Sequence, residues 1–251
     1  MNGGYYDSYW GEQGFVGAGE VRNPHLLSLI RSNIPPNSSV LDVGCGDGTS
    51  IAPVLREHPI DYVGVDISAT AVAFARRNNL EARTIENAAD LPFDDASFDA
   101  ALCLEVFEHL SDPRSAAAEA ARVLRGGGVL IASVPNVAFW RRRLDLLCGR
   151  WNPEGDDLSV AEPWRDPHLR FFTTAALRSM LLQAGFGSVE VSGGHGNFLG
   201  YLPYVGWRWL WRARARRGKF DTGSPLYKAV QRRYPSLLGM RLYAVARLRD
   251  P

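Results

Sequence analysis

Residues 40–50 read VLDVGCGDGTS, an apolar strand pattern that runs into glycines at alternate positions. Glycine weakens a strand and costs backbone entropy, so Gly44, Gly46 and Gly48 indicate a backbone that turns sharply or approaches another group closely. Glycines after a first core strand suit a nucleotide-like ligand, because backbone N–H groups and the next helix can reach it. The spacing G-x-G-x-G-T departs from the G-x-G-x-x-G of dinucleotide-binding folds, so a plain glycine-rich turn stays open as an alternative.

Strand and helix patterns alternate along the rest of the chain. Strands are predicted over 39–44, 61–68, 81–86, 97–105, 129–135, 187–193 and 241–249, and helices over 24–34, 49–58, 69–78, 113–125 and 174–186. Such alternation implies an α/β fold with a parallel sheet, helices on both faces and a ligand site beyond the carboxyl ends of the strands. We expect Gly126 to Gly128 to end the fourth of these helices.

We expect one domain over residues 1–251, with three segments outside the alternation. Residues 1–22 have weak periodicity and predict a loose lead-in. Residues 136–172 and 194–239 are long for loops in a compact domain, so they predict insertions that form an acceptor lid or a membrane-facing surface.

Composition excludes several classes of protein. The chain has 251 residues, 46% of them hydrophobic and 22% charged, with a net charge of +1, so nothing drives it as a whole towards nucleic acid. Its three cysteines form no CxxC pair, which argues for a reducing compartment and against a disulfide framework or a thiolate zinc site. The first residues lack the basic start and apolar run of a signal peptide, and no apolar stretch is long enough to span a membrane. We therefore expect a cytoplasmic protein.

Two acidic residues near the glycines favour one cofactor class. Asp42 lies inside the first strand, where a carboxylate is costly unless a cation pairs with it, and the amino acid end of S-adenosylmethionine offers one. Asp66 ends the second strand, where an acid can bind both ribose hydroxyls. The alternative for Asp66 is a helix N-cap, a role that Ser68 fills better. Asn87 and the backbone of Ala88 follow the third strand and could read the adenine edge.

Four motifs in order resemble those of class I S-adenosylmethionine-dependent methyltransferases: VLDVGCGDGTS, YVGVDIS, ENAADLPFDDASFDAALCLEVFEHL and RVLRGGGVLIASVPN. The resemblance covers residues 38–136 closely and extends to 168–186. It implies a Rossmann-like seven-stranded sheet with an antiparallel last strand, S-adenosylmethionine as cofactor and S-adenosylhomocysteine as product. It also implies that the glycines pass beside the methionine end of the cofactor. The cofactor contacts that it implies are Asp42, Gly44, Cys45, Gly46, Asp66, Ile67, Asn87, Ala88 and Glu105 or its neighbours. Asn87 departs from the family, which often has aspartate there.

The catalytic candidates lie in EVFEH and HLRFF. A hydroxyl acceptor must lose a proton, and a general base within hydrogen-bond reach accelerates that by about 10² to 10⁴. Glu105, Glu108 and His109 stand at i, i+3 and i+4 just past the fourth strand, on one face of a helical turn. They resemble the Glu-x-x-Glu-His group of the ubiquinone-pathway O-methyltransferases, a group that is associated with metal binding in those enzymes. Three alternatives stay open: His109 as base, a divalent metal held by the three residues, or a turn that only packs. His168 is a second candidate base, or a loop histidine bonded to backbone.

Both insertions combine tryptophan with arginine. Trp140, Leu144 and Leu147 share a helical face flanked by Arg141, Arg142 and Arg143, a composition typical of an interfacial amphipathic helix. The second insertion places Trp207, Leu210, Trp211 and Arg214 on one face of a strongly basic segment. Membrane contact and a lid packed on the domain are the main alternatives, and RNA binding through stacking is weaker.

The sequence therefore predicts an O-methyltransferase for a hydroxyl on a small or lipid-linked acceptor, such as a quinone precursor, a glycolipid or a secondary metabolite. One alternative is methylation of a soluble sugar or natural product, with the insertions as lid only. Another is a non-catalytic, S-adenosylmethionine-binding partner subunit. A peripheral position on the inner face of a membrane is an alternative to a purely cytoplasmic one, and no nucleic acid partner is expected.

Overall fold

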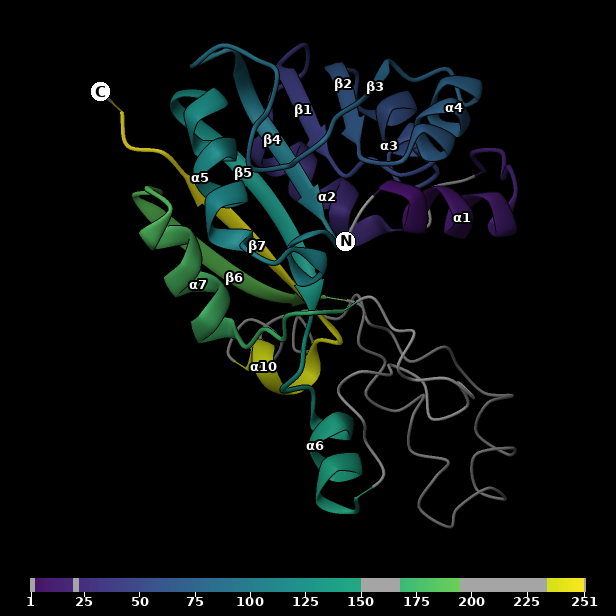
Figure 1. The fold of residues 1–251 in the computed structure, drawn as a ribbon. Coiled ribbons are helices and arrows are strands. Elements are labelled where there is room, and N and C mark those ends of the chain that lie inside the picture. The colour runs from purple at the N-terminus through teal and green to yellow at the C-terminus, as the bar shows by residue number, and fades with distance from the viewer. Residues whose placement is uncertain (1–2, 20–22, 150–167, 195–233, 251) are drawn as a thin grey trace, which may run out of the picture.

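The computed structural model describes residues 3–19, 23–149, 168–194 and 234–250. Within these residues seven strands form one sheet in the order β3-β2-β1-β4-β5-β7-β6 (Figure 1). The strands are β1 (Ser39–Val43), β2 (Asp61–Asp66), β3 (Ala82–Thr84), β4 (Phe98–Leu104), β5 (Leu124–Pro135), β6 (Ser188–Gly194) and β7 (Arg241–Arg247). Strands β1 to β5 pair in parallel, whereas β7 runs antiparallel to both β5 and β6. The predicted Rossmann-like sheet with an antiparallel last strand is confirmed.

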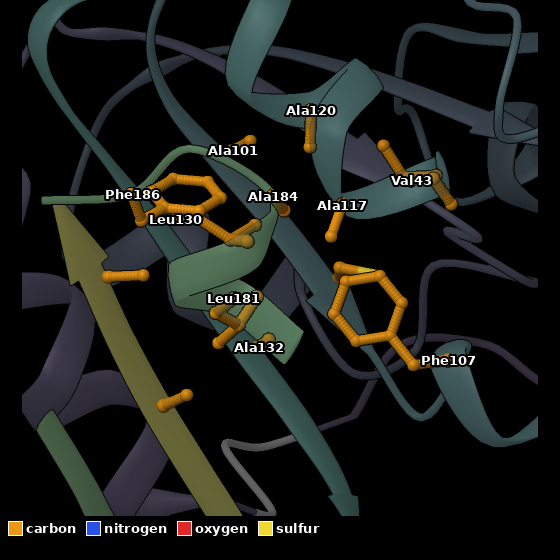
Figure 2. Packing of buried hydrophobic residues seen from close by; sticks show 14 of the residues in the cluster. Val43, Ala101, Phe107, Ala117, Ala120, Leu130, Ala132, Leu181, Ala184 and Phe186 are labelled. Carbon is orange, nitrogen blue, oxygen red and sulfur yellow. The ribbon is translucent and has the colours of Figure 1, made fainter. Parts of the chain in front are cut away.

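Helices cover both faces of this sheet (Figure 1). One core lies under α2 (Pro24–Asn33), α3 (Ala52–Glu57) and α4 (Ala69–Arg77), and the other lies under α5 (Pro113–Val123) and α7 (Thr174–Gln183). Figure 2 shows the second core, where Ala117 and Ala120 of α5 and Leu181 of α7 face Leu130 of β5. Alanine on α5 lets that helix approach the sheet closely, and the buried apolar area is the main stabilising contribution.

Helix boundaries follow the local capping residues. Asn23 accepts a hydrogen bond from the N–H of Leu26 and precedes Pro24, as the sequence predicts. Ser68 accepts from the N–H of Ala71, so Ser68 is the N-cap of α4 and Asp66 is left for another role. Helix α7 ends at Gln183, and Gly185 two residues later has a φ of 109°.

The first residues differ from the expected loose lead-in, because they form helix α1 (Gly3–Gln13), which lies against α4 (Figure 1). Asp7 fixes this contact, since its Oδ1 accepts the hydroxyl of Ser68 at 2.6 Å and the N–H of Thr70 at 3.0 Å. The helix is therefore held by tertiary contacts with α4. Its own sequence is weakly amphipathic and gives no such indication.

The glycine run before the fifth strand also differs from expectation. Helix α5 ends at Val123 and β5 begins at Leu124, so Gly126 to Gly128 belong to the strand and do not form the helix end. The pairing of β5 with β4 shifts register between Phe98 and Ala100, beside these glycines. Such irregularities favour glycine within a strand.

The first insertion contributes helix α6 (Trp140–Leu147), which lies apart from the sheet (Figure 1). Leu144, Leu146 and Leu147 are exposed on it. Its arginines are engaged: Arg141 pairs with Asp145, while the other two donate to backbone oxygens of Asn136 and Ala138. The described part of the second insertion includes α10 (Pro235–Leu238), and the predicted Trp207, Leu210, Trp211 and Arg214 lie outside the described residues. No helix within the described ranges has the length and apolar character needed to cross a membrane.

Candidate active site

The glycine loop lies at the carboxyl end of β1, between β2 and the segment that follows β4. The N–H groups of Gly44 and Cys45 both donate to the carbonyl of Val65 in β2, which turns the chain sharply after β1. Gly44 and Gly46 have φ values of 75° and 56°, in the left-handed region that favours glycine. A Cβ on Gly44 would collide with Val106, and one on Gly46 would lie 2.9 Å from the Trp10 ring. Protein packing therefore already demands these glycines, and the loop touches both the segment after β4 and helix α1.

Asp42 is buried in β1 with one oxygen engaged and one left over. Its Oδ2 accepts the hydroxyl of Tyr62 at 2.8 Å, and its buried Oδ1 has no hydrogen-bond partner within the described residues. Burial raises the pKa of Asp42 to about 7. A buried carboxylate oxygen without a donor is costly, so the site fits a cationic group supplied by a ligand.

Asp66 joins the end of β2 to the glycine loop. Its Oδ2 accepts the N–H of Gly46 at 2.9 Å, and its Oδ1 accepts the N–H of Ser68 at 2.9 Å. Burial raises its pKa, whereas these backbone donors lower it. Each carboxylate oxygen can accept a second hydrogen bond, so both could still receive a ribose hydroxyl.

The remaining candidate cofactor residues surround this loop. The Cys45 thiol is buried, which raises its pKa far above the usual range and keeps it neutral. Ile67 is half-buried, and its carbonyl faces Gly3 of α1. Asn87 is exposed, and its side-chain oxygen accepts the N–H of Ala89 at 2.9 Å, while Ala88 packs against the core. Asn87 thus stabilises its own turn and keeps its NH₂ group as a donor.

Glu105 does not share a face with Glu108 and His109, contrary to the sequence-based expectation. Its φ of 58° reverses the chain before the short helix η1 (Phe107–His109) begins. The Glu105 carboxylate instead accepts the Ser133 hydroxyl at 2.7 Å and pairs with Arg241 at 3.0 Å. It therefore braces β4 against β5 and β7.

The structure joins the two histidine candidates to Glu108. Figure 2 shows Phe107 inserted in the core, and this anchor fixes Glu108 and His109 on η1. The carbonyl of Glu108 accepts the N–H groups of Leu169 and Arg170, which brings the preceding His168 alongside. The Nε2 atoms of His109 and His168 each lie 4.0 Å from Glu108 Oε1, and the Glu108 side chain is 1% exposed.

This Glu108–His109–His168 group could act on protons or hold a metal. Its three ligand atoms lie within 4.8 Å of one another. Two imidazoles and a carboxylate suit a divalent transition metal such as Zn²⁺. The same set suits a general base beside a carboxylate that stabilises the imidazolium. From the sequence, His109 and His168 are separate candidates, and Glu105 is expected as the third member of the group. In the structure His168 takes that third place.

Sequence reasoning missed the contribution of α1 to this site. The Tyr6 ring meets His109 edge to face, with centroids 6.1 Å apart. Burial and the charges of Asp66 and Glu108 raise the pKa of the Tyr6 hydroxyl, so Tyr6 lies within the field of both carboxylates. The one indication in the sequence was the density of aromatic residues in YYDSYW.

Comparisons with known proteins show the family to which the chain belongs. The family model of a methyltransferase domain matches residues 41–132, which run from within β1 into β5 and include the glycine loop. The chain is 32% identical over 176 residues to the O-methyltransferase rstn1 of Aspergillus nomiae, covering 64% of this chain and 78% of that protein. The chain is a class I S-adenosylmethionine-dependent methyltransferase. The methyltransferase therefore uses S-adenosylmethionine and releases S-adenosylhomocysteine.

Two further proteins are similar to this methyltransferase over most of its length. It is 26% identical over 194 residues to the ubiquinone biosynthesis O-methyltransferase of Hydrogenovibrio crunogenus, covering 74% of this chain and 78% of that one. The crystal structure of an S-adenosylmethionine-dependent methyltransferase from Thermotoga maritima, a possible histamine N-methyltransferase, superposes with a TM-score of 0.56. That superposition covers 88% of this chain and 86% of the other at 20% identity, so it concerns the fold alone.

Proposed function

We propose that the methyltransferase methylates a hydroxyl oxygen of a small or lipid-linked acceptor, with His109 as general base. The observation that carries the proposal is the Glu108–His109–His168 group beyond the end of β4. It lies beside the glycine loop, since Val106 of the same segment contacts Gly44. A base at this place is close to the loop that holds the cofactor.

The reaction is an in-line displacement at the methyl carbon. The acceptor oxygen forms a bond to that carbon while the bond to the sulfonium sulfur breaks, and the neutral thioether leaves. The hydroxyl proton passes to the imidazole of His109. Glu108, buried 4.0 Å away, stabilises the imidazolium that results, and His168 fixes the ring by stacking on it.

The residues proposed to bind the cofactor are assigned from the hydrogen-bond donors and acceptors that they offer. Asp42 has a buried oxygen for the amino group, and Asp66 has spare acceptor capacity for the ribose hydroxyls. Gly44, Cys45, Gly46 and Ile67 line the same turn, and Asn87 and Ala88 lie past the end of β3, where the adenine would be read. Glu105 stays a candidate for this set, because Ser133 and Arg241 engage its carboxylate but each oxygen can accept a further hydrogen bond.

A divalent metal is the alternative for the same group of residues. Glu108, His109 and His168 would hold it, and when bound it would lower the pKa of an acceptor hydroxyl that it contacts. In that case none of the three residues would act as the free base. The two alternatives differ in their response to a chelator.

The class of acceptor is inferred from the relatives and from α6. The names of two relatives, O-methyltransferase rstn1 and ubiquinone biosynthesis O-methyltransferase, support a hydroxyl on a small molecule, and the second favours a quinone precursor. The exposed Leu144, Leu146 and Leu147 favour a lipid-linked acceptor met at a membrane surface. A soluble sugar or natural product, with both insertions as a lid, is the second candidate.

Transfer of radiolabelled methyl groups into host-cell extract tests the proposal. The extract is incubated with labelled S-adenosylmethionine and either the parent protein, His109→Ala or the matched surface variant Leu169→Ala. Label in the lipid or small-molecule fraction that needs His109 and not Leu169 is the expected result. Label confined to protein or RNA would refute the acceptor class, and bound cofactor with no label would favour the partner-subunit alternative.

A further inference from the structure

We propose that Tyr62 is a positioning residue for the cofactor's amino group, because its hydroxyl holds one oxygen of Asp42 and leaves the other for the ammonium. This inference rests on the proposed pairing of Asp42 with the amino group. It adds Tyr62, which lies outside the glycine loop, to the residues that act on cofactor binding. It also predicts that cofactor binding depends on pH.

The contact between Tyr62 and Asp42 is built into the register of two strands. Asp42 in β1 pairs directly with Gly64 in β2, and Tyr62 stands two residues before Gly64 on the same face. A Cβ on Gly64 would lie 2.9 Å from the Tyr62 hydroxyl oxygen and 2.8 Å from the Cys45 sulfur. The missing side chain of Gly64 therefore makes the space through which the Tyr62 hydroxyl reaches Asp42.

The contact is also isolated from solvent and from other donors. Tyr62 is 7% exposed and Asp42 is 3% exposed. The hydroxyl donates to Oδ2 at 2.8 Å, and Oδ1 has no hydrogen-bond partner among the described residues. One oxygen is thereby fixed in orientation, and the other is presented to whatever cation enters.

Within the part of the chain that the structure describes, few titratable groups face Asp42. Burial raises its pKa to about 7, the hydrogen bond from Tyr62 opposes this rise, and the charge of Asp66 adds to it. Cys45 follows β1 and Cys103 lies on β4, and burial raises the pKa of both thiols far above neutrality. Near pH 7, protonation of Asp42 itself therefore decides whether this site is negative.

This arrangement couples cofactor binding to the release of a proton from Asp42. Only the charged carboxylate pairs with an ammonium, so binding below about pH 7 must release the Asp42 proton, and affinity falls by about tenfold per pH unit. Above about pH 8 the cofactor's own α-amino group loses its proton, so affinity falls again. Affinity is therefore highest between these limits.

Removing the Tyr62 hydroxyl shifts the pH at which cofactor affinity falls on the acid side. The hydroxyl donates to the charged carboxylate, so Tyr62→Phe raises the pKa of Asp42 and shifts the fall in affinity by about one to two units towards higher pH. The loss of affinity is then about tenfold or more at pH 6 and only about a few-fold at pH 8. If Tyr62 had a purely structural role, its replacement would weaken cofactor binding equally at pH 6 and at pH 8.

Calorimetric titration of the full chain with S-adenosylhomocysteine tests this. The amino acid end of this product is that of the cofactor, and it undergoes no turnover. Titrations at pH 6, 7 and 8, each in two buffers of different ionisation enthalpy, give both the affinity and the number of protons released. The matched control is Tyr243→Phe, another buried tyrosine, whose hydroxyl accepts from Asn23 and which lies on β7, separated from β1 by β4 and β5.

We expect proton release by the parent at pH 6, a pH-dependent loss in Tyr62→Phe and an unchanged profile in Tyr243→Phe. Gly64→Ala, whose methyl group would displace both the Tyr62 hydroxyl and the Cys45 thiol, should also weaken binding. A Tyr62→Phe profile parallel to that of the parent would overturn the role of Tyr62. Asp42→Asn separates this from the function proposed for Asp42, because parent-like affinity and proton release in that variant would refute the Asp42 pairing itself.

Discussion

His109 and His168 stack on each other beyond the end of β4, with ring centroids 4.8 Å apart and planes inclined by 22°. Two backbone hydrogen bonds from Leu169 and Arg170 to the carbonyl of Glu108 hold the second histidine in place. Both rings thus share the buried Glu108 carboxylate, so the three side chains form one unit. Residues that act as a unit give strongly non-additive effects when they are removed.

His109→Ala should slow single-turnover methyl transfer by about 10²-fold or more, because the base is lost. His168→Ala should slow it less, and the double variant should be little slower than His109→Ala alone. Rapid-quench measurements with the acceptor fraction that takes the label would show this. Cofactor affinity should stay within about twofold in all three, since none of these side chains is assigned to the cofactor.

Leu169→Ala is the control for these variants, because it changes an exposed side chain on the same segment. Parent-like rates in His109→Ala would remove His109 as base. Strictly additive losses would show that the two histidines act separately.

A chelator should leave the transfer rate of the parent protein unchanged if His109 is the base. The comparison is between protein dialysed against EDTA and the same protein with Zn²⁺, Mn²⁺ or Mg²⁺ restored. Loss of activity on dialysis with recovery on adding one of these metals would instead favour a metal held by Glu108, His109 and His168. Glu108→Gln should then reduce metal binding as well as turnover.

Asp66→Ala should weaken S-adenosylmethionine binding by at least about tenfold, because the ribose hydroxyls and the N–H of Gly46 both lose their acceptor. Calorimetry measures this directly. Asp66→Asn keeps one acceptor oxygen and should fall between the parent and the alanine variant. Asp61→Ala, which removes an exposed carboxylate at the other end of β2, should bind as the parent does; equal affinities in all four proteins would contradict the ribose assignment.

The sheet, the glycine loop and the capping residues could be predicted because each depends on a local pattern. Alternation, glycine spacing and caps such as Ser68 lie within a few residues of the features that they determine. Helix α1 could not be predicted, because Asp7 stabilises it through bonds to Ser68 and Thr70, far away in the sequence. Glu105 was placed wrongly for a related reason: its positive φ breaks the helical spacing on which the prediction depended.

The role of α1 at the glycine loop can be tested through Trp10. Its ring lies over Gly46, where an added methyl group would come within 2.9 Å of it. Trp10→Ala should therefore open the loop and weaken cofactor binding several-fold, as measured by calorimetry. Tyr9→Ala, an exposed neighbour on the same helix, is the matched control. A similar loss in both variants would mean that helix stability, and not the ring contact, is responsible.

Asp42 should make the ligand-free protein less stable as the pH rises. Its pKa of about 7 in the folded protein lies above the usual 3.8. Between these values the folded state keeps a proton that the unfolded chain has lost, so the free energy of unfolding falls as pH rises from about 4 to about 7. Asp42→Asn keeps the oxygen that accepts from Tyr62 and carries no charge, so it should remove this fall.

Thermal unfolding at pH 5 and pH 8 measures the effect. Without ligand, Asp42→Asn should match the parent near pH 5 and melt several degrees higher at pH 8, because the parent alone then buries an unpaired charge. Added S-adenosylhomocysteine should reverse the order at pH 8, since its ammonium pairs with the parent carboxylate and stabilises the folded state in proportion to its affinity. An equal difference at both pH values without ligand would show that Asp42 does not titrate in this range, and the charge that the cofactor meets would have to come from elsewhere.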